Sequence, residues 1–232
     1  MSTALPPAAR TAWVSADRIV GWVDRFNASH GASSITETAE QGFELSAADG
    51  ARASLQPPWP VAGRPGSGSG PAARLASLSG QARPIGLILI RRGGYALALC
   101  REGAVLASKV GTRHVQSRTA AGGWSQQRFA RRRANQADAM IEAVAAHAAA
   151  LPLHEAEYLV LGGDKAMAAA VVAEPVLRQL ARLPRLEFLD VPDPRAKVLA
   201  LAAQRACSVK ITVTDPSGAP GRADPAQQNP VR

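Results

Sequence analysis

The sequence predicts an α/β fold: a mixed β-sheet with helices packed on it, preceded by a small α+β module at the N-terminus. In the second half of the chain, closely spaced β-rich runs give way to strands that alternate with helical segments. A Gly-, Pro- and Ser-rich stretch separates that half from a short helical pattern followed by short strands. The 232 residues, of which 47% are hydrophobic, suffice for one substantial domain and a smaller companion.

Residues 1–60 are expected to form the small N-terminal module. Apolar residues recur at mostly helical spacing from Trp13 to Phe26, which predicts an amphipathic helix. The turn dipeptide Asp49-Gly50 lies among short strand-like runs, namely 33–38, 42–47 and 51–55. Trp13, Trp22 and Trp59 are expected to pack in the core or between domains rather than to form a partner site.

Residues 61–82 are poor in apolar side chains and read as a flexible linker, so a domain boundary is expected near Arg83. The second domain is predicted to span 83–213. Residues 214–232, which contain four prolines, are expected to be a disordered tail.

The second domain is predicted to begin with an antiparallel meander of three strands, because the turns at Gly93-Gly94 and Glu102-Gly103 are short. Its strands are expected at 85–90, 95–100 and 104–110. A helix is predicted over 126–149, with an apolar stripe and Pro152 near its end. After it, strands are expected at 158–161, 186–191 and 209–213, and helices at 165–173, 176–182 and 194–206.

The positive charge of the chain is concentrated in one segment. The formal net charge is +9, and the stretch from Lys109 to Gln136 holds seven cations and no acid, which leaves +2 for everything else. Such a segment favours a polyanionic partner, either nucleic acid or an anionic membrane surface.

Other classes of protein are disfavoured by what the sequence lacks. The N-terminus has no pattern of a secretory signal, and no apolar run approaches the roughly 20 residues that span a bilayer, so a cytoplasmic protein without a membrane partner is expected. Cys100 and Cys207 form no metal-ligand pair and are expected to be reduced thiols in or beside the core. We expect no metal and no cofactor.

The basic segment offers amides, hydroxyls and guanidiniums rather than an activated nucleophile or an acid–base pair. Its one imidazole, His114, is expected to be a polar loop group. Gly122 and Gly123 allow the backbone to approach a ligand closely, and Ser125 can cap the following helix and direct its positive end toward phosphate. Gln126 and Gln127 supply neutral amides that can hold a water molecule.

Arginines and one tryptophan supply the expected RNA contacts of this segment. Trp124 can stack on a base, and Arg113 and Arg118 can bind phosphate. On a helical wheel, three further arginines share the face opposite the apolar stripe: Arg128, Arg131 and Arg132. Arg133 lies on the apolar side and is expected to extend over the core.

Several alternatives stay open at this stage. The basic segment could be a solvated loop or a general phosphate-binding loop. Asp164, Asp190 and Asp193 could serve a nuclease, although metal-dependent nucleases need clustered acids. Gly162-Gly163 before a helix could suggest a nucleotide-binding turn, but the full fingerprint of such a turn is missing, so packing is favoured.

The stretch from Gly122 to Arg133, Gly-Gly-Trp-Ser-Gln-Gln-Arg-Phe-Ala-Arg-Arg-Arg, resembles the catalytic loop and following helix of the middle domain of eukaryotic and archaeal class-one release factors. The resemblance continues through Tyr158–Asp164 and 186–191 and includes the preceding meander. It covers roughly 83–213, with only the loop and helix being specific, and it implies a release-factor-like catalytic domain with an RNase H-like layer.

In class-one release factors a glutamine directly follows the glycine pair, whereas Trp124 occupies that place here. A displaced glutamine is similar to the Vms-type release factors of ribosome quality control, and this chain resembles their bacterial, actinobacterial-type relatives. That family implies hydrolysis of the ester between a stalled nascent chain and tRNA on the large ribosomal subunit. The resemblance points to Gln126, or alternatively Gln127, as the catalytic glutamine.

The expected partners are therefore ribosomal RNA of the large subunit and peptidyl-tRNA, and the protein is expected to act as a monomer. The competing hypothesis is a non-catalytic module that binds ribosomal or other RNA through the same arginines.

Overall fold

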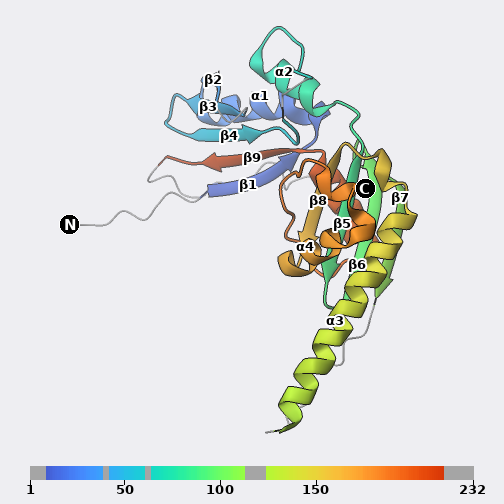
Figure 1. Cartoon of the computed structure of the whole chain (residues 1–232). Helices are drawn as coiled ribbons and strands as arrows, with labels where there is room; N and C mark the ends of the chain where they lie inside the picture. Colours follow the sequence, from blue (N-terminus) through green and yellow to red (C-terminus); the bar gives the residue numbers. More distant parts are fainter. Residues whose placement is uncertain (1–8, 39–41, 61–63, 113–123, 217–232) are drawn as a thin grey trace, which may run out of the picture. The chain divides into compact units, whose positions relative to one another are not determined.

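The computed structural model describes residues 9–38, 42–60, 64–112 and 124–216. The chain divides into two units, one of residues 1–81 and 207–232 and the other of residues 82–206. The described residues form an antiparallel sheet in the first unit and a mixed sheet in the second, with five α-helices in all (Figure 1). The predicted α/β fold class is confirmed.

The first unit is a five-stranded antiparallel sheet with helices against it. The strand order is β1-β9-β4-β3-β2. The strands are β1 (Ala9–Val14), β2 (Ser33–Glu37), β3 (Phe43–Ala47), β4 (Arg52–Gln56) and β9 (Val209–Thr214). A 3₁₀ turn η1 (Ala16–Arg18) leads into α1 (Ile19–His30), and α2 (Pro71–Ser79) follows β4.

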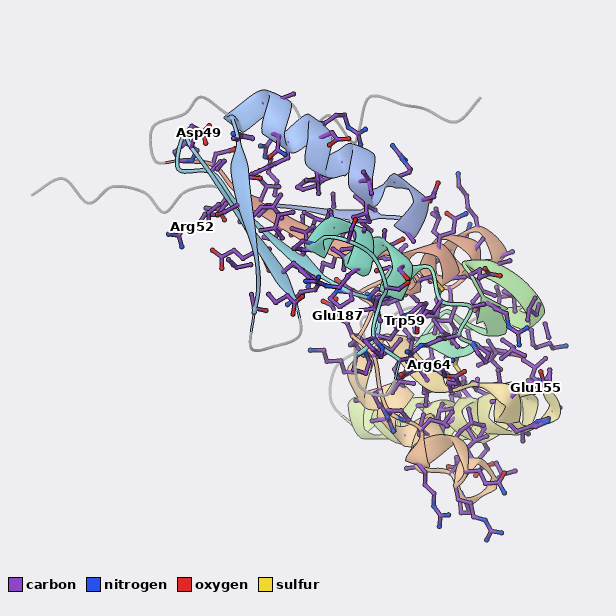
Figure 2. All side chains as sticks on the ribbon, turned by 90° about the horizontal axis from the view of Figure 1, so that it is seen from above. Asp49, Arg52, Trp59, Arg64, Glu155 and Glu187 are labelled. Carbon is purple, nitrogen blue, oxygen red and sulfur yellow. The ribbon has the colours of Figure 1, made fainter. Side chains whose placement is uncertain are left out.

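The core of the first unit lies between these helices and one face of the sheet. Trp22 on α1 is buried, and so is Trp59, whose indole N–H donates a hydrogen bond of 2.8 Å to the carbonyl of Leu78 on α2 (Figure 2). Trp22 belongs to the apolar core of this unit, and both side chains are buried, as expected of tryptophans that pack in the core or between domains. On the other face, the exposed residues of β4 are polar, namely Arg52, Ser54 and Gln56, as is usual for an antiparallel sheet that is covered on one side.

The predicted turn at Asp49-Gly50 is confirmed between β3 and β4 (Figure 2). Gly50 has a φ of 91°, a value that favours glycine. The Asp49 carboxylate accepts a hydrogen bond of 2.9 Å from the backbone N–H of Ala51 and lies 2.9 Å from Nδ1 of His30. These contacts, the backbone hydrogen bond most of all, lower the pKa of the Asp49 carboxyl.

Three expectations for this part of the chain are corrected. Trp13 belongs to strand β1 and not to a helix, because β1 pairs with β9, where Trp13 lies opposite Lys210. The stretch predicted as linker, 61–82, contains α2, which buries Leu75 and Leu78. Strand 209–213, assigned to the second domain, is β9 in the sheet of the first unit, between β1 and β4.

The second unit is built on a mixed four-stranded sheet of order β7-β6-β5-β8. The strands are β5 (Ile85–Arg91), β6 (Gly94–Arg101), β7 (Ala104–Thr112) and β8 (Tyr158–Gly163). The first three form the predicted antiparallel meander, and β8 is parallel to β5. The helices are α3 (Trp124–Ala150), α4 (Lys165–Ala173) and α5 (Ala196–Ala206), with short 3₁₀ turns η2 (Leu153–Glu155), η3 (Pro175–Leu177) and η4 (Leu180–Arg182).

Helices cover both faces of this sheet. Ile88 and Ile90 point into a core that includes Met140 and Val144 of α3 and residues of α4. Leu87 and Leu89 alternate with them and are also fully buried, and α5 packs on β6 and β7. This burial explains why β5 is almost continuously apolar.

The strand predicted over 186–191 does not form as a regular strand. The segment runs beside β8 and makes two isolated parallel bridges, Arg185 with Leu159 and Leu189 with Gly162. Its backbone still bonds to β8, with the N–H of Leu189 donating to the carbonyl of Leu161 at 2.9 Å. The apolar pattern of 186–191 therefore correctly indicated a segment that lies beside β8, but the hydrogen bonds between the two are interrupted.

Candidate functional site

The basic segment leaves the sheet of the second unit at one edge, where β7 ends. β7 ends at Thr112, which pairs with Gly94 at the start of β6, and β5 and β8 end beside each other, where Ile90 pairs with Gly163. We call this the carboxyl edge, the edge where β5, β7 and β8 end. The loop that joins β7 to α3, with the predicted site residues Arg113, His114, Arg118, Gly122 and Gly123, lies outside the described residues.

Helix α3 begins at Trp124, two residues earlier than predicted, so Ser125 lies within the first turn rather than before the helix. Gln126 and Gln127 are therefore first-turn residues. That turn contains no acidic residue. Because the first backbone N–H groups of a helix have no partner within it and carry partial positive charge, this end of α3 suits an anionic or polarised oxygen.

The N-terminal turns of α3 extend past the sheet (Figure 1). Gln136, Asp138 and Ala139 are exposed, and Met140 is the first residue of α3 that the structure shows as buried. Sixteen residues separate Trp124 from Met140, which at 1.5 Å per residue is about 24 Å of helix. The first turn of α3 thus stands well away from the core that holds the helix.

The backbone of α3 is a continuous helix, so helical periodicity fixes which residues share a face. Met140, Val144 and Ala148 are buried on one face, as the apolar stripe predicts. Three arginines fall on the opposite face of the same helix: Arg128, Arg131 and Arg132. The structure describes the helical backbone but not the side chains of residues 124–135, which include Trp124, Gln126, Gln127 and these arginines.

A packed group that the sequence analysis did not single out lies where the loop leaves β7. The ring of Tyr95 on β6 stacks on that of His147 on α3, with centroids 5.7 Å apart. A Cβ added to Gly111 of β7 would lie 2.4 Å from the same tyrosine ring, so only glycine fits there without movement. Burial raises the pKa of the Tyr95 hydroxyl. These residues connect β7, β6 and α3 at the base of the projecting segment.

The nuclease alternative is not supported by the acidic residues of this unit. The Asp164 carboxylate caps α4 and accepts hydrogen bonds from the N–H groups of Ala166 (3.0 Å) and Met167 (3.1 Å). Asp190 pairs with Arg91 at 2.8 Å. No three His, Cys, Asp or Glu side chains gather into a metal-binding group within the described part of the chain.

Replacing Asp164 by alanine is expected to destabilise the protein by about 1 kcal/mol, because two N–H groups of α4 lose their acceptor. Asp164→Asn keeps an acceptor and should cost less. Urea unfolding of both variants measures the difference, and peptide release at a temperature where both are folded should match the wild type. Strong loss of peptide release in folded Asp164→Asn would instead indicate that the Asp164 carboxylate takes part in catalysis.

Gly162 and Gly163 are required by packing, which favours the structural interpretation of this turn over nucleotide binding. A Cβ on Gly162 would lie 2.7 Å from the carbonyl oxygen of Leu189, and one on Gly163 would lie 2.2 Å from that of Ile90. Gly163 also has a φ of 91°. The two glycines let β8 lie close to its neighbours at the carboxyl edge.

Neither cysteine forms a disulfide, and Cys100 is buried and Cys207 half-buried, in agreement with the expected positions in or beside the core. Among the residues described, no helix has the length and apolar character that a membrane span requires.

Residues 83–212 match the family model of the actinobacteria/chloroflexi VLRF1 release factor. The chain belongs to this family. The match begins where the second unit begins and runs through the whole of that unit into β9. A comparison with curated proteins finds none that matches.

Membership of the VLRF1 family confirms the resemblance to an actinobacterial-type Vms-like release factor. It gives the chain a release-factor function directed at the ribosome. Because the matched region includes α3 and the loop before it, the family assignment covers every site residue that the sequence predicted.

Proposed function

We propose that this VLRF1 chain is a peptidyl-tRNA hydrolase that releases nascent chains from stalled large ribosomal subunits. The observation that carries the proposal is the projection of α3: Met140 is the first residue of this helix that the structure shows as buried, and Gln126 and Gln127 lie about 20 Å before it along the helix axis. Such a projection suits a reactive centre that lies in a recess of a much larger partner. The family match supports the same assignment.

In the proposed mechanism, Gly122 and Gly123 bring the backbone close to the peptidyl-tRNA ester. Gln126 holds a water molecule next to the carbonyl carbon of that ester. The water attacks, the ester C–O bond breaks, and the tRNA ribose hydroxyl leaves with a proton. Backbone N–H groups in the first turn of α3 can stabilise the negative charge that develops on the carbonyl oxygen. Ribosomal RNA would supply the remaining surroundings, since the basic segment lacks a base or nucleophile of its own.

In this proposal the arginines position the protein on the ribosome. Arg128, Arg131 and Arg132, together with Arg113 and Arg118, bind RNA phosphates, while Trp124 stacks on a base. No acidic residue occurs from Lys109 to Gln136 to neutralise them. The protein would act in the cytoplasm, as a monomer and without a metal or cofactor.

The alternative is a release-factor fold that binds RNA through the same arginines without hydrolysis. It is favoured by one feature, the presence of Trp124 where a release factor has its glutamine. Binding measurements alone do not separate the two functions. Peptide release does.

The proposal predicts that purified protein releases peptide from large subunits that carry peptidyl-tRNA, and that binding weakens steeply with salt. Changing Arg128, Arg131 and Arg132 together to glutamine should flatten the dependence of log binding constant on log salt concentration by about 3, because each lost phosphate contact contributes about 1. Co-sedimentation across a salt series measures binding.

The matched control for that variant is Arg18, Arg25 and Arg101 changed together to glutamine, three exposed cations outside the basic segment. It removes the same net charge and should leave both the slope and release unchanged. Failure of the wild-type protein to release peptide from bound subunits would leave only the non-catalytic alternative. Salt-insensitive binding would contradict the role of the arginine face.

A further inference from the structure

We propose that Arg178, Arg182 and Arg185 form a second RNA-binding surface, which contacts phosphates of large-subunit ribosomal RNA and lies at the edge of the sheet where β5 and β8 begin. We call these three residues the arginine triad. The inference rests on the ribosome binding in the proposed function but not on hydrolysis.

The local sequence explains why the arginines of the triad face outward. In Val176-Leu-Arg-Gln-Leu-Ala-Arg-Leu-Pro-Arg185, leucines recur at every third position, the spacing of the 3₁₀ turns η3 and η4. Leu177 and Leu180 are buried, and Leu183 packs against the same core. The leucines hold the segment on the core and leave Arg178, Arg182 and Arg185 exposed.

The three side chains of the triad are exposed and have no ion-pair partner in the described part of the chain. None of its three guanidiniums makes an ion pair or a hydrogen bond with the described residues. The charge of Glu187 (labelled in Figure 2) interacts with Arg205. Burial lowers the pKa of the Arg205 guanidinium, and the negative charge of Glu187 partly offsets that effect. Glu174 is half-buried at the end of α4. Three unpaired guanidiniums on a short surface segment match phosphate oxygens, which arginine binds in a bidentate manner.

The triad lies at the amino edge of the sheet, the edge where β5 and β8 begin. Arg185 bridges to Leu159, the second residue of β8. A Cβ on Gly86, the second residue of β5, would lie 3.8 Å from the side chain of Leu180. β7 ends at Thr112 on the carboxyl edge, so the triad and the end of β7 lie at opposite edges of the sheet.

Helix α3 sets the separation between the two surfaces. Its 27 residues span about 40 Å, from the first turn that carries Gln126 to Ala150, which precedes the start of β8. This exceeds one turn of a nucleic-acid helix, about 34 Å. Both surfaces belong to one compact unit, and an extended polyanion that spans about 40 Å is the partner that fits. Ribosomal RNA of the large subunit is such a partner.

The test compares binding of the full-length protein to vacant large subunits and to subunits loaded with peptidyl-tRNA. The triad variant changes Arg178, Arg182 and Arg185 to glutamine, and the control again changes Arg18, Arg25 and Arg101. We expect the triad variant to bind vacant subunits about tenfold or more weakly at low salt, with a salt slope smaller by about 3. The control should bind like the wild type, and all three proteins should melt together, since the changed side chains are exposed.

Equal binding and equal slopes for the triad variant and the wild type would overturn the inference. So would a defect seen only on subunits that carry peptidyl-tRNA, because the phosphates contacted would then belong to tRNA. Release assays keep this result apart from the proposed function. If the wild type binds subunits but releases no peptide, the proposed hydrolysis is wrong, and the salt slopes still test whether the triad binds RNA. If the wild type does not bind subunits, both the proposed function and the role of the triad are wrong.

Discussion

Replacing Gln126 with alanine is expected to slow peptide release by about 100-fold or more, while binding to the large subunit stays unchanged. The amide is proposed to hold the attacking water, and loss of one preorganised polar group at a reacting centre costs about 3 kcal/mol of transition-state stabilisation. Binding should survive, since the arginines of α3 and the triad carry the phosphate contacts. Single-turnover release from loaded subunits, with co-sedimentation in parallel, measures both quantities.

Gln127→Ala and Gln136→Ala make this result specific. Gln127 shares the first turn of α3 with Gln126, whereas Gln136 is an exposed residue of the same helix near the point where burial begins. Gln136→Ala should release peptide at the wild-type rate. Slow peptide release by Gln127→Ala together with wild-type release by Gln126→Ala would indicate that Gln127 holds the attacking water. Full activity in the double variant would mean that neither amide performs the chemistry.

The parts of the fold that sequence predicts well are those that local pattern determines. The meander follows from short turns between apolar runs, and α4 was expected at its observed bounds, because its sequence is rich in alanine and Pro175 follows it. The core face of α3 follows from helical spacing alone. The family resemblance of the segment after Gly122 is likewise a property of contiguous residues, and the family model confirms it.

The elements that could not be predicted from sequence form because of contacts between residues that lie far apart in the chain. Trp13 has helical spacing with the residues after it, yet it is in a strand because β1 pairs with β9 almost 200 residues later. The packing of Tyr95 on His147 and Gly111 has no signature in sequence, since the three residues lie on three elements. The Gly-, Pro- and Ser-rich stretch hid α2, whose burial of Leu75 and Leu78 depends on the rest of the first unit.

Replacing Gly163 with alanine is expected to destabilise the second unit by about 2–6 kcal/mol. The backbone there has a φ of 91°, which costs an L-residue about 1–3 kcal/mol. The added Cβ would also lie 2.2 Å from the carbonyl oxygen of Ile90, and overpacking of this kind costs about 1–3 kcal/mol more. That oxygen cannot turn away cheaply, because it accepts a hydrogen bond of 2.7 Å from the N–H of Asp164.

The loss is large against the 5–15 kcal/mol that typically stabilises a domain, and it should lower the melting temperature by roughly 10–20 °C. Gly93→Ala is the matched control in the same unit: it lies at the same edge, and the nearest atom to its Cβ would be a carboxylate oxygen of Asp193 at 3.6 Å, an ordinary contact. Thermal unfolding followed by circular dichroism compares the two variants. If they melt within about a degree of each other, the β5 and β8 backbones yield at little cost, and the requirement for glycine before α4 must lie in function rather than in packing.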